Sequence, residues 1–88
     1  MDVEYDKALK NRLKRMEGQI RGILGMLEAG EDCREVVTQL SAVRTAVDRT
    51  IGVVIGSNLK HCIQEELEKG NSPDKVIEEA VELLVKSR

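Results

Sequence analysis

The 88 residues are enough for one small domain, and with Tyr5 as the single aromatic residue its core has to be aliphatic. The formal net charge of −2 argues against a uniformly basic surface, and a thin aliphatic core leads us to expect an oligomer. The N-terminus lacks the apolar core of a signal peptide and no apolar run reaches membrane-spanning length, so we expect a cytoplasmic protein without a membrane partner.

The first predicted helix covers about residues 5–29, where apolar residues recur at steps of three and four: Leu9, Leu13, Met16, Ile20, Ile23, Leu24 and Leu27. Gly30 follows as its natural stop. Gly18, Gly22 and Gly25 lie on another side of this helix. Because each costs about 1 kcal/mol relative to Ala, they predict close backbone approach to another element. Plain tolerance of glycine in a helix is the alternative.

Positive charge gathers on this first helix. Arg12, Arg15 and Gln19 fall on one side of it, away from the leucines, with Lys14 beside them, and Arg49 is the notable cation near the middle of the next helix. Cations arranged in this way on a symmetric oligomer suit contacts to DNA phosphates more than base-by-base reading. A solvated charged face is the alternative, and composition alone does not favour either.

A second helix is predicted from Glu31 or Asp32, with Asp32 as its N-cap, to a break at residues 69–71. Its stripe keeps the helical rhythm throughout: Cys33, Val36, Leu40, Val43, Val47, Ile51, Val54, Asn58 and Cys62. Gly52 and Gly56 lie four residues apart inside it, a spacing that suits tight helix packing. The sequence therefore predicts one unusually long middle helix.

A third helix is predicted after Ser72 as N-cap, with Pro73 at the first helical position. Its apolar face is formed by Val76, Ile77, Ala80, Leu83 and Leu84. Acids predominate from residue 65 to residue 82, in contrast to the first helix. With no strand-like alternation and no repeat, we predict an all-α fold of three helices in a single domain, residues 1–88.

The two cysteines, Cys33 and Cys62, share a face of the predicted middle helix, because the steps between them add up to about eight full turns plus roughly 20°. They are nevertheless about 43 Å apart along the axis at 1.5 Å per residue, so they cannot meet within one continuous helix. A second copy running antiparallel about a midpoint near Val47 and Asp48 would bring Cys33 of one chain to Cys62 of the other, twice per dimer. Two small hydrophobic residues on a packed stripe are the alternative.

Three polar residues lie near this candidate dithiol. Asn58 is on the same stripe one turn before Cys62, a position that a purely structural seam would rarely give to an amide. His61 is adjacent to Cys62 but points about 100° away from it, so we expect an exposed bystander. Glu78 on the third helix is placed to approach the site from outside. The absence of CxxC and HExxH motifs gives zinc or thioredoxin-like chemistry little support.

The run RLKRMEGQIRGILGMLEAGEDCREVVTQLSAVRTAVDR, which contains Cys33 and is followed by Cys62, resembles the copper-sensitive operon repressor family, CsoR, which includes the nickel/cobalt and formaldehyde sensors RcnR and FrmR. The resemblance extends to the closing EEAVELLVKSR. It implies a three-helix protomer, an antiparallel dimer with a four-helix-bundle core and a disc-shaped tetramer. It also implies repression through operator DNA, with Arg12, Lys14 and Arg49 at positions that match the family's DNA-binding residues.

Copper sensors of this family bind the metal through a Cys at the start of the middle helix and a His and Cys of the partner in the pattern H-x-x-x-C. Cys33 and Cys62 match this set, whereas Asn58 stands at the histidine position. A Cys/Cys pair with this asparagine resembles the persulfide-sensing CstR branch, in which persulfides or polysulfides link the two thiols and derepress transcription. Thiolate attack on a sulfane sulfur needs two thiols and no metal.

We therefore predict a repressor, not an enzyme, that is derepressed by small sulfur-containing inducers and has no cofactor. A copper(I) sensor using Cys33 and Cys62 as metal ligands is the runner-up, since copper(I) prefers soft donors. A thiol-disulfide or sulfur-transfer enzyme and a helical scaffold with incidental cysteines are the remaining alternatives.

Overall fold

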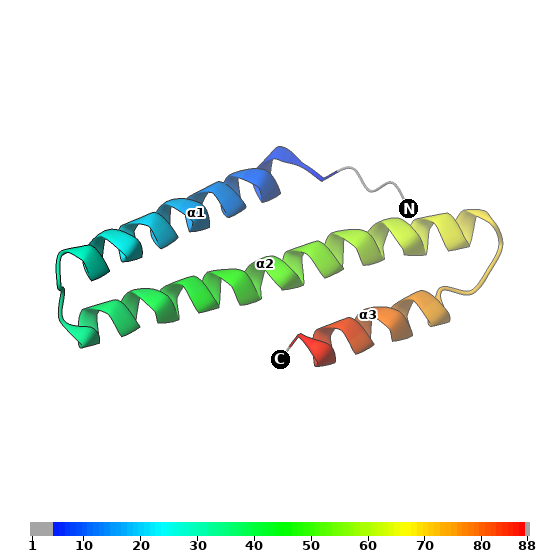
Figure 1. Cartoon of the computed structure of the whole chain (residues 1–88). Helices are drawn as coiled ribbons and strands as arrows, with labels where there is room; N and C mark the ends of the chain where they lie inside the picture. The colour runs from blue at the N-terminus through cyan, green and yellow to red at the C-terminus, as the bar shows by residue number, and fades with distance from the viewer. Residues whose placement is uncertain (1–4, 88) are drawn as a thin grey trace. The chain divides into compact units, whose positions relative to one another are not determined.

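The computed structural model describes residues 5–87, which form three α-helices and contain no strand. They are α1 (Lys7–Glu28), α2 (Cys33–Glu68) and α3 (Asp74–Lys86), in that order along the chain (Figure 1). The predicted all-α fold with a dominant middle helix is confirmed, since α2 alone has 36 residues. The predicted single domain also includes residues 1–4 and 88, which lie outside the described residues.

Two N-caps set where the first two helices begin. Asp6 precedes α1, and its Oδ1 accepts the backbone N–H of Leu9 at 2.9 Å. Asp32 precedes α2, and its Oδ1 accepts the N–H of Arg34 at 3.4 Å, in agreement with the predicted cap. These aspartates stabilise the starts of their helices because the first N–H groups of a helix lack partners within it.

The start of α3 differs by one residue from the prediction. Pro73 is the N-cap, with φ −82° and ψ 3°, and α3 begins at Asp74. The predictions of Ser72 as the N-cap and of Pro73 at the first helical position are therefore both wrong. The carbonyl of Pro73 accepts the N–H of Ile77 at 3.1 Å, which is the bond that an N-cap carbonyl makes. Ser72 still contributes, because its Oγ accepts the N–H of Asp74 at 3.3 Å.

The described chain divides into two compact units, and the first consists of residues 5–50. In this unit α1 lies antiparallel to the first half of α2 (Figure 1). Leu9, Met16 and Ile23, seven residues apart, are the buried residues of α1. Thr50 is buried on α2, and its hydroxyl donates to the carbonyl of Ala46 at 2.7 Å. One narrow strip of each helix thus forms the core of this helical hairpin.

The second unit, residues 51–87, pairs the second half of α2 with α3 (Figure 1). Its two buried residues are Cys62 of α2 and Ala80 of α3. Leu59, Ile63 and Val76 are half-buried. Cys62 is therefore part of the small apolar core of this unit, whereas Cys33 in the first unit is exposed.

A single chain leaves much of its apolar surface uncovered. Large side chains between 40% and 53% exposed include Leu13, Ile20 and Leu24 of α1, Leu40 and Val47 of α2, and Ile77, Val81 and Leu84 of α3. Burial of such surface is the main favourable contribution to folding and association. The exposed apolar strips are therefore surface that binding of another molecule could bury, and the predicted oligomer stays a prediction. None of the helices among the described residues is both long and apolar enough to span a membrane.

The glycines of α1 do not make the close contact that their spacing predicts. A Cβ built on Gly18, Gly22 or Gly25 would meet nothing within 4 Å, and the same holds for Gly52 and Gly56 of α2. The prediction of close backbone approach is therefore wrong for contacts within one chain.

Replacing the N-cap of α1 tests this description of the helix start. We expect Asp6→Ala to lower the free energy of unfolding by about 1 kcal/mol, because the N–H of Leu9 loses its acceptor. Urea denaturation followed by circular dichroism measures the change. Asp6→Asn, which keeps a side-chain oxygen, is the control and should retain most of the stability; an alanine variant as stable as the wild type would contradict the cap.

Candidate functional site

The first unit has two opposite faces, which follow from the angular order of residues on α1. At about 100° per residue, Leu9, Met16 and Ile23 mark the side of α1 that meets α2. Leu13, Ile20 and Leu24 lie on one edge of that buried side, and all are exposed. Arg12, Arg15 and Gln19 lie on the other edge. One edge of α1 is therefore apolar and the other carries the predicted DNA-binding side chains.

The first half of α2 repeats this arrangement. Its half-buried Val36 and Val43 and its buried Thr50 mark the side that meets α1. Cys33, Leu40 and Val47 lie on one edge of that side, and Arg49 lies towards the other. On each helix, counting from the side that faces the other helix, the apolar residues lie in one direction of rotation and the arginines in the opposite direction. Because α1 and α2 run antiparallel, the same direction of rotation leads to the same face of the hairpin on both helices.

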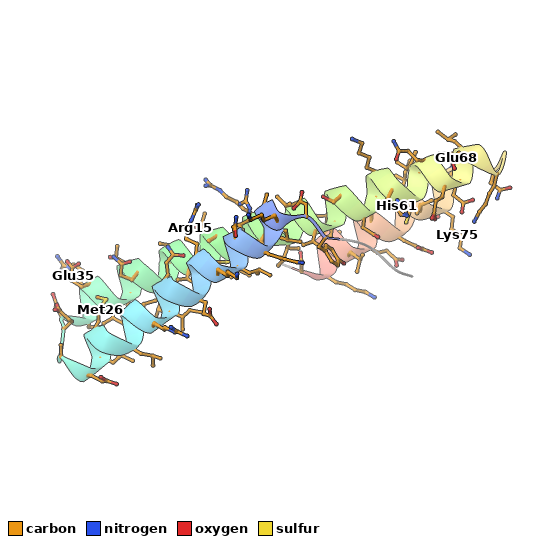
Figure 2. All side chains as sticks on the ribbon, turned by 90° about the horizontal axis from the view of Figure 1, so that it is seen from above. Arg15, Met26, Glu35, His61, Glu68 and Lys75 are labelled. Atoms are coloured by element: carbon orange, nitrogen blue, oxygen red, sulfur yellow. The ribbon has the colours of Figure 1, made fainter. Side chains whose placement is uncertain are left out.

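The hairpin therefore has an apolar face and an arginine face on opposite sides. The apolar face is formed by Leu13, Ile20 and Leu24 of α1 with Cys33, Leu40 and Val47 of α2. The arginine face is formed by Arg12, Arg15 and Gln19 of α1 with Arg49 of α2. The arginines are exposed, Gln19 is half-buried, and Figure 2 shows Arg15 projecting from α1.

Arg12 and Arg49 lie at the same height on this face. Arg12 is as far along the chain before Glu28, the last residue of α1, as Arg49 is after Cys33, the first residue of α2. Two antiparallel helices of equal rise therefore bring the two arginines level with each other. Lys14 is exposed, but it points about 100° away from Arg15, which belongs to the arginine face. Lys14 therefore lies on the outer side of α1, outside the arginine face.

Cys33 is the first residue of α2 and is exposed on the apolar face. Cys62 is 8% exposed and lies in the second unit, in whose core Ala80 of α3 is equally buried. The two thiols thus occupy different environments on one helix. Cys33 is open to solvent at the start of the apolar face, whereas Cys62 is covered within its own chain.

Asn58 lies one helical turn before Cys62, as predicted, and is half-buried. The Sγ of Cys62 is 4.0 Å from the Oδ1 of Asn58, at the long end of the range for an S–H···O contact. The side chain next to the buried thiol is therefore an amide and not an imidazole.

His61 is turned towards its own helix surface. Its Nε2 is 3.0 Å from the Oε1 of Glu65, and both side chains are about half exposed. Glu65 was not among the predicted site residues, although a carboxylate four residues after a histidine is the spacing at which helix side chains meet. Figure 2 shows His61 on the second half of α2.

Glu78 is exposed and lies on the side of α3 opposite to Ala80. The second unit therefore does not bring it to Cys62 within one chain. Its predicted place near the candidate dithiol stays a prediction.

The donor chemistry around Cys62 suits copper(I) only in part. Thiolates are the soft donors that copper(I) prefers, whereas the oxygen of Asn58 is a hard donor. Within residues 5–87 of one chain, no group of three or more His, Cys, Asp or Glu side chains is placed to hold a metal ion. Any metal bound by both cysteines would have to be shared between copies.

Comparison with known proteins gives consistent matches over most of the chain. The sequence matches the metal-sensitive transcriptional repressor family over residues 5–86. The Bacillus subtilis protein YrkD is 57% identical over 63 residues, which are 72% of this chain and all of YrkD. The copper-sensing transcriptional repressor CsoR of Bacillus subtilis is 33% identical over 80% of this chain and 69% of its own length.

A solved structure supports the same assignment. The nickel-responsive transcriptional regulator InrS is 34% identical, with a TM-score of 0.77 over 98% of this chain and 96% of InrS. Members of the matched family are transcriptional repressors and not enzymes. The predicted resemblance is confirmed at the level of the family: this chain belongs to the metal-sensitive transcriptional repressors of the CsoR type.

Proposed function

We propose that this chain is an operator-binding repressor in which Cys33 of one subunit and Cys62 of the partner subunit form a thiol switch for persulfides or polysulfides. The observation that carries the proposal is the amide of Asn58 beside Cys62, on a helix whose first residue is the other cysteine, Cys33. The copies assemble as an antiparallel dimer and, as the family resemblance implies, as a tetramer of two such dimers.

The geometry of α2 supports an intersubunit site. The helix has no break between Cys33 and Cys62, so its rise separates the thiols by about 43 Å along its axis. Cys33 shares the apolar face with Leu40 and Val47, which a single chain leaves uncovered. An antiparallel partner covers this face and supplies Cys62 beside Cys33, twice in each dimer.

The switch needs no metal and no external electron acceptor beyond the persulfide. A Cys thiolate attacks the sulfane sulfur of RS–SH, forming Cys–S–SH and releasing RSH. The facing thiolate then attacks the Cys-bound sulfur of that persulfide, which forms an interchain disulfide and releases hydrosulfide. If both cysteines become persulfides first, their condensation gives a trisulfide and hydrosulfide. In either route one sulfane sulfur is reduced to hydrosulfide and the two cysteines are oxidised; in the second route the other sulfane sulfur stays in the trisulfide.

The arginine face is the proposed operator-binding surface. Arg12 and Arg49 are level with each other and exposed, on the side of the hairpin opposite to Cys33. Guanidinium groups bind phosphates in a bidentate manner, so this face suits contact with the DNA backbone. Because both faces belong to one helical hairpin, a change in how two copies pack at Cys33 also moves the arginines relative to the phosphates.

A copper(I)-responsive repressor is the second candidate, because CsoR of Bacillus subtilis is named as copper-sensing and copper(I) prefers thiol ligands. Cys33 and the partner's Cys62 would then be two metal ligands. The amide at position 58 is the observation that ranks this candidate second.

The thiol switch is tested by treating the reduced protein with a persulfide donor or with copper(I). Intact mass spectrometry under denaturing, non-reducing conditions is combined with operator binding on the same samples. We expect the donor to give covalent dimers, with loss of operator affinity that dithiothreitol restores. Cys33→Ser and Cys62→Ser should each abolish both effects, whereas His61→Gln, the matched control one residue away, should leave them intact. Release from the operator under copper(I) alone would contradict the thiol switch and favour the second candidate.

The arginine face is tested by measuring operator affinity for Arg12→Ala and Arg49→Ala. Each substitution should weaken binding about tenfold and lower the slope of log K against log[salt] by about one, because one phosphate contact is lost. Lys75→Ala, an exposed cation of α3, is the control and should bind as the wild type does. Unchanged affinity in both arginine variants would exclude this surface.

Introducing an imidazole at position 58, beside Cys62, tests the role assigned to Asn58. We expect Asn58→His to raise copper(I) affinity by about tenfold or more, since a third donor joins the two thiolates. Competition with a chromophoric copper(I) chelator measures the affinity, with Ser57→His as the control on a neighbouring side of the helix. Equal copper(I) affinity for Asn58→His and the wild type would contradict the view that position 58 separates the two chemistries.

A further inference from the structure

The middle of α2 contains two opposite charges, Arg44 and Asp48. Asp48 is the only acidic residue between Glu35 and Glu65, and Arg44 precedes it by four residues. Both are exposed, and neither has an ion pair or a side-chain hydrogen bond within the described part of the chain. Residues four apart on a helix are spaced for pairing, so the absence of an Arg44–Asp48 pair leaves both groups available to another molecule.

Their positions on the helix point to the apolar face. Arg44 lies eleven residues after Cys33, which is three turns plus about 20°, so it projects from the same edge of α2 as Cys33 and Leu40. Asp48 follows about 40° further round. Arg49 points about 100° beyond Asp48 and belongs to the arginine face. Two oppositely charged side chains thus lie within or beside the apolar face.

We propose that Arg44 forms an ion pair with Asp48 of the partner subunit, twice in each dimer, and that this reciprocal pair fixes the antiparallel orientation of the two α2 helices. The inference rests on the proposed dithiol, which sets the midpoint of the pairing at (33 + 62)/2 = 47.5. Arg44 is then level with the partner's residue 51, and the partner's Asp48 is level with residue 47. The offset of three residues is about 4.5 Å along the axis, within reach of an arginine side chain.

The same residues disfavour the alternative orientation. In a parallel, in-register pair of α2 helices, Arg44 would lie level with Arg44 of the partner subunit and Asp48 with the partner's Asp48. Like charges would then face each other across an aliphatic surface, where water screens them less than at an open surface. The apolar strip alone distinguishes poorly between orientations, because aliphatic contacts are not directional. Charge therefore supplies the specificity that brings Cys33 to the partner's Cys62 and not to a second Cys33.

The pair is tested with two charge-reversed chains, Arg44→Asp and Asp48→Arg, in the reduced state and without DNA. Alone, each homodimer contains only like charges at the proposed contacts, and we expect its self-association to be about tenfold weaker than that of the wild type. Mixed in equal amounts, the two chains place the introduced acid opposite the introduced arginine at one contact and the native Arg44 opposite the native Asp48 at the other. The mixture should therefore associate with wild-type affinity, as a heterodimer.

Sedimentation equilibrium measures the affinities, and native mass spectrometry of chains with different tags counts the heterodimers. Gln39→Asp, which adds an acid on another side of α2, is the control and should self-associate as the wild type does. The heterodimer also excludes misfolding of either variant. Charge reversal that leaves both homodimers at wild-type affinity, or a mixture that stays dissociated, would overturn the ion pair. Crosslinking of Cys33 to the partner's Cys62 is measured separately, on the wild-type protein. Failure of the ion pair and failure of the thiol switch are therefore distinguishable.

Discussion

The rise and twist of one α-helix limit what this chain can do with its two cysteines. The 36 residues of α2 hold Cys33 and Cys62 on one face and, by helix geometry, about 43 Å apart. No rearrangement of side chains brings them together while the helix is intact. Chemistry that uses both thiols therefore needs a second chain, and the uncovered apolar strip along α2 and α1 is the surface on which that chain would lie.

The hairpin of α1 and α2 connects this surface to the arginines. Its two faces are opposite sides of one small packed unit, whose core is little more than Leu9, Met16, Ile23 and their neighbours on α2. Interfaces of this kind have discrete packing arrangements and do not deform continuously. A covalent link at Cys33 that favours one arrangement would change the spacing of Arg12 and Arg49 across the oligomer. The coupling needs only about 3 kcal/mol to change operator affinity by two orders of magnitude.

Sequence periodicity and caps were sufficient to predict three helices, the N-cap Asp32 and the break after α2, because these depend on residues within a few positions of each other. The one-residue error at Pro73 arose because proline is most common at the first helical position, whereas here its carbonyl already accepts the N–H of Ile77. The prediction from the glycines of α1 was wrong, since their spacing alone does not show that another element packs against them, and a Cβ there would meet nothing within 4 Å. The arginine face required the position of the turn between α1 and α2, which sets Arg12 level with Arg49. The partner of His61, Glu65, was missed although its spacing was visible.

The antiparallel placement of the two thiols is tested most directly by mixing Cys33→Ser chains with Cys62→Ser chains. Each mixed dimer would retain a single Cys33 to Cys62 pair, whereas the thiols in either homodimer would be tens of ångströms apart. After treatment with a persulfide donor, a covalent dimer detected by intact mass spectrometry only in the mixture is the predicted result. A covalent dimer in either variant alone, or none in the mixture while the wild type is linked, would contradict the intersubunit dithiol.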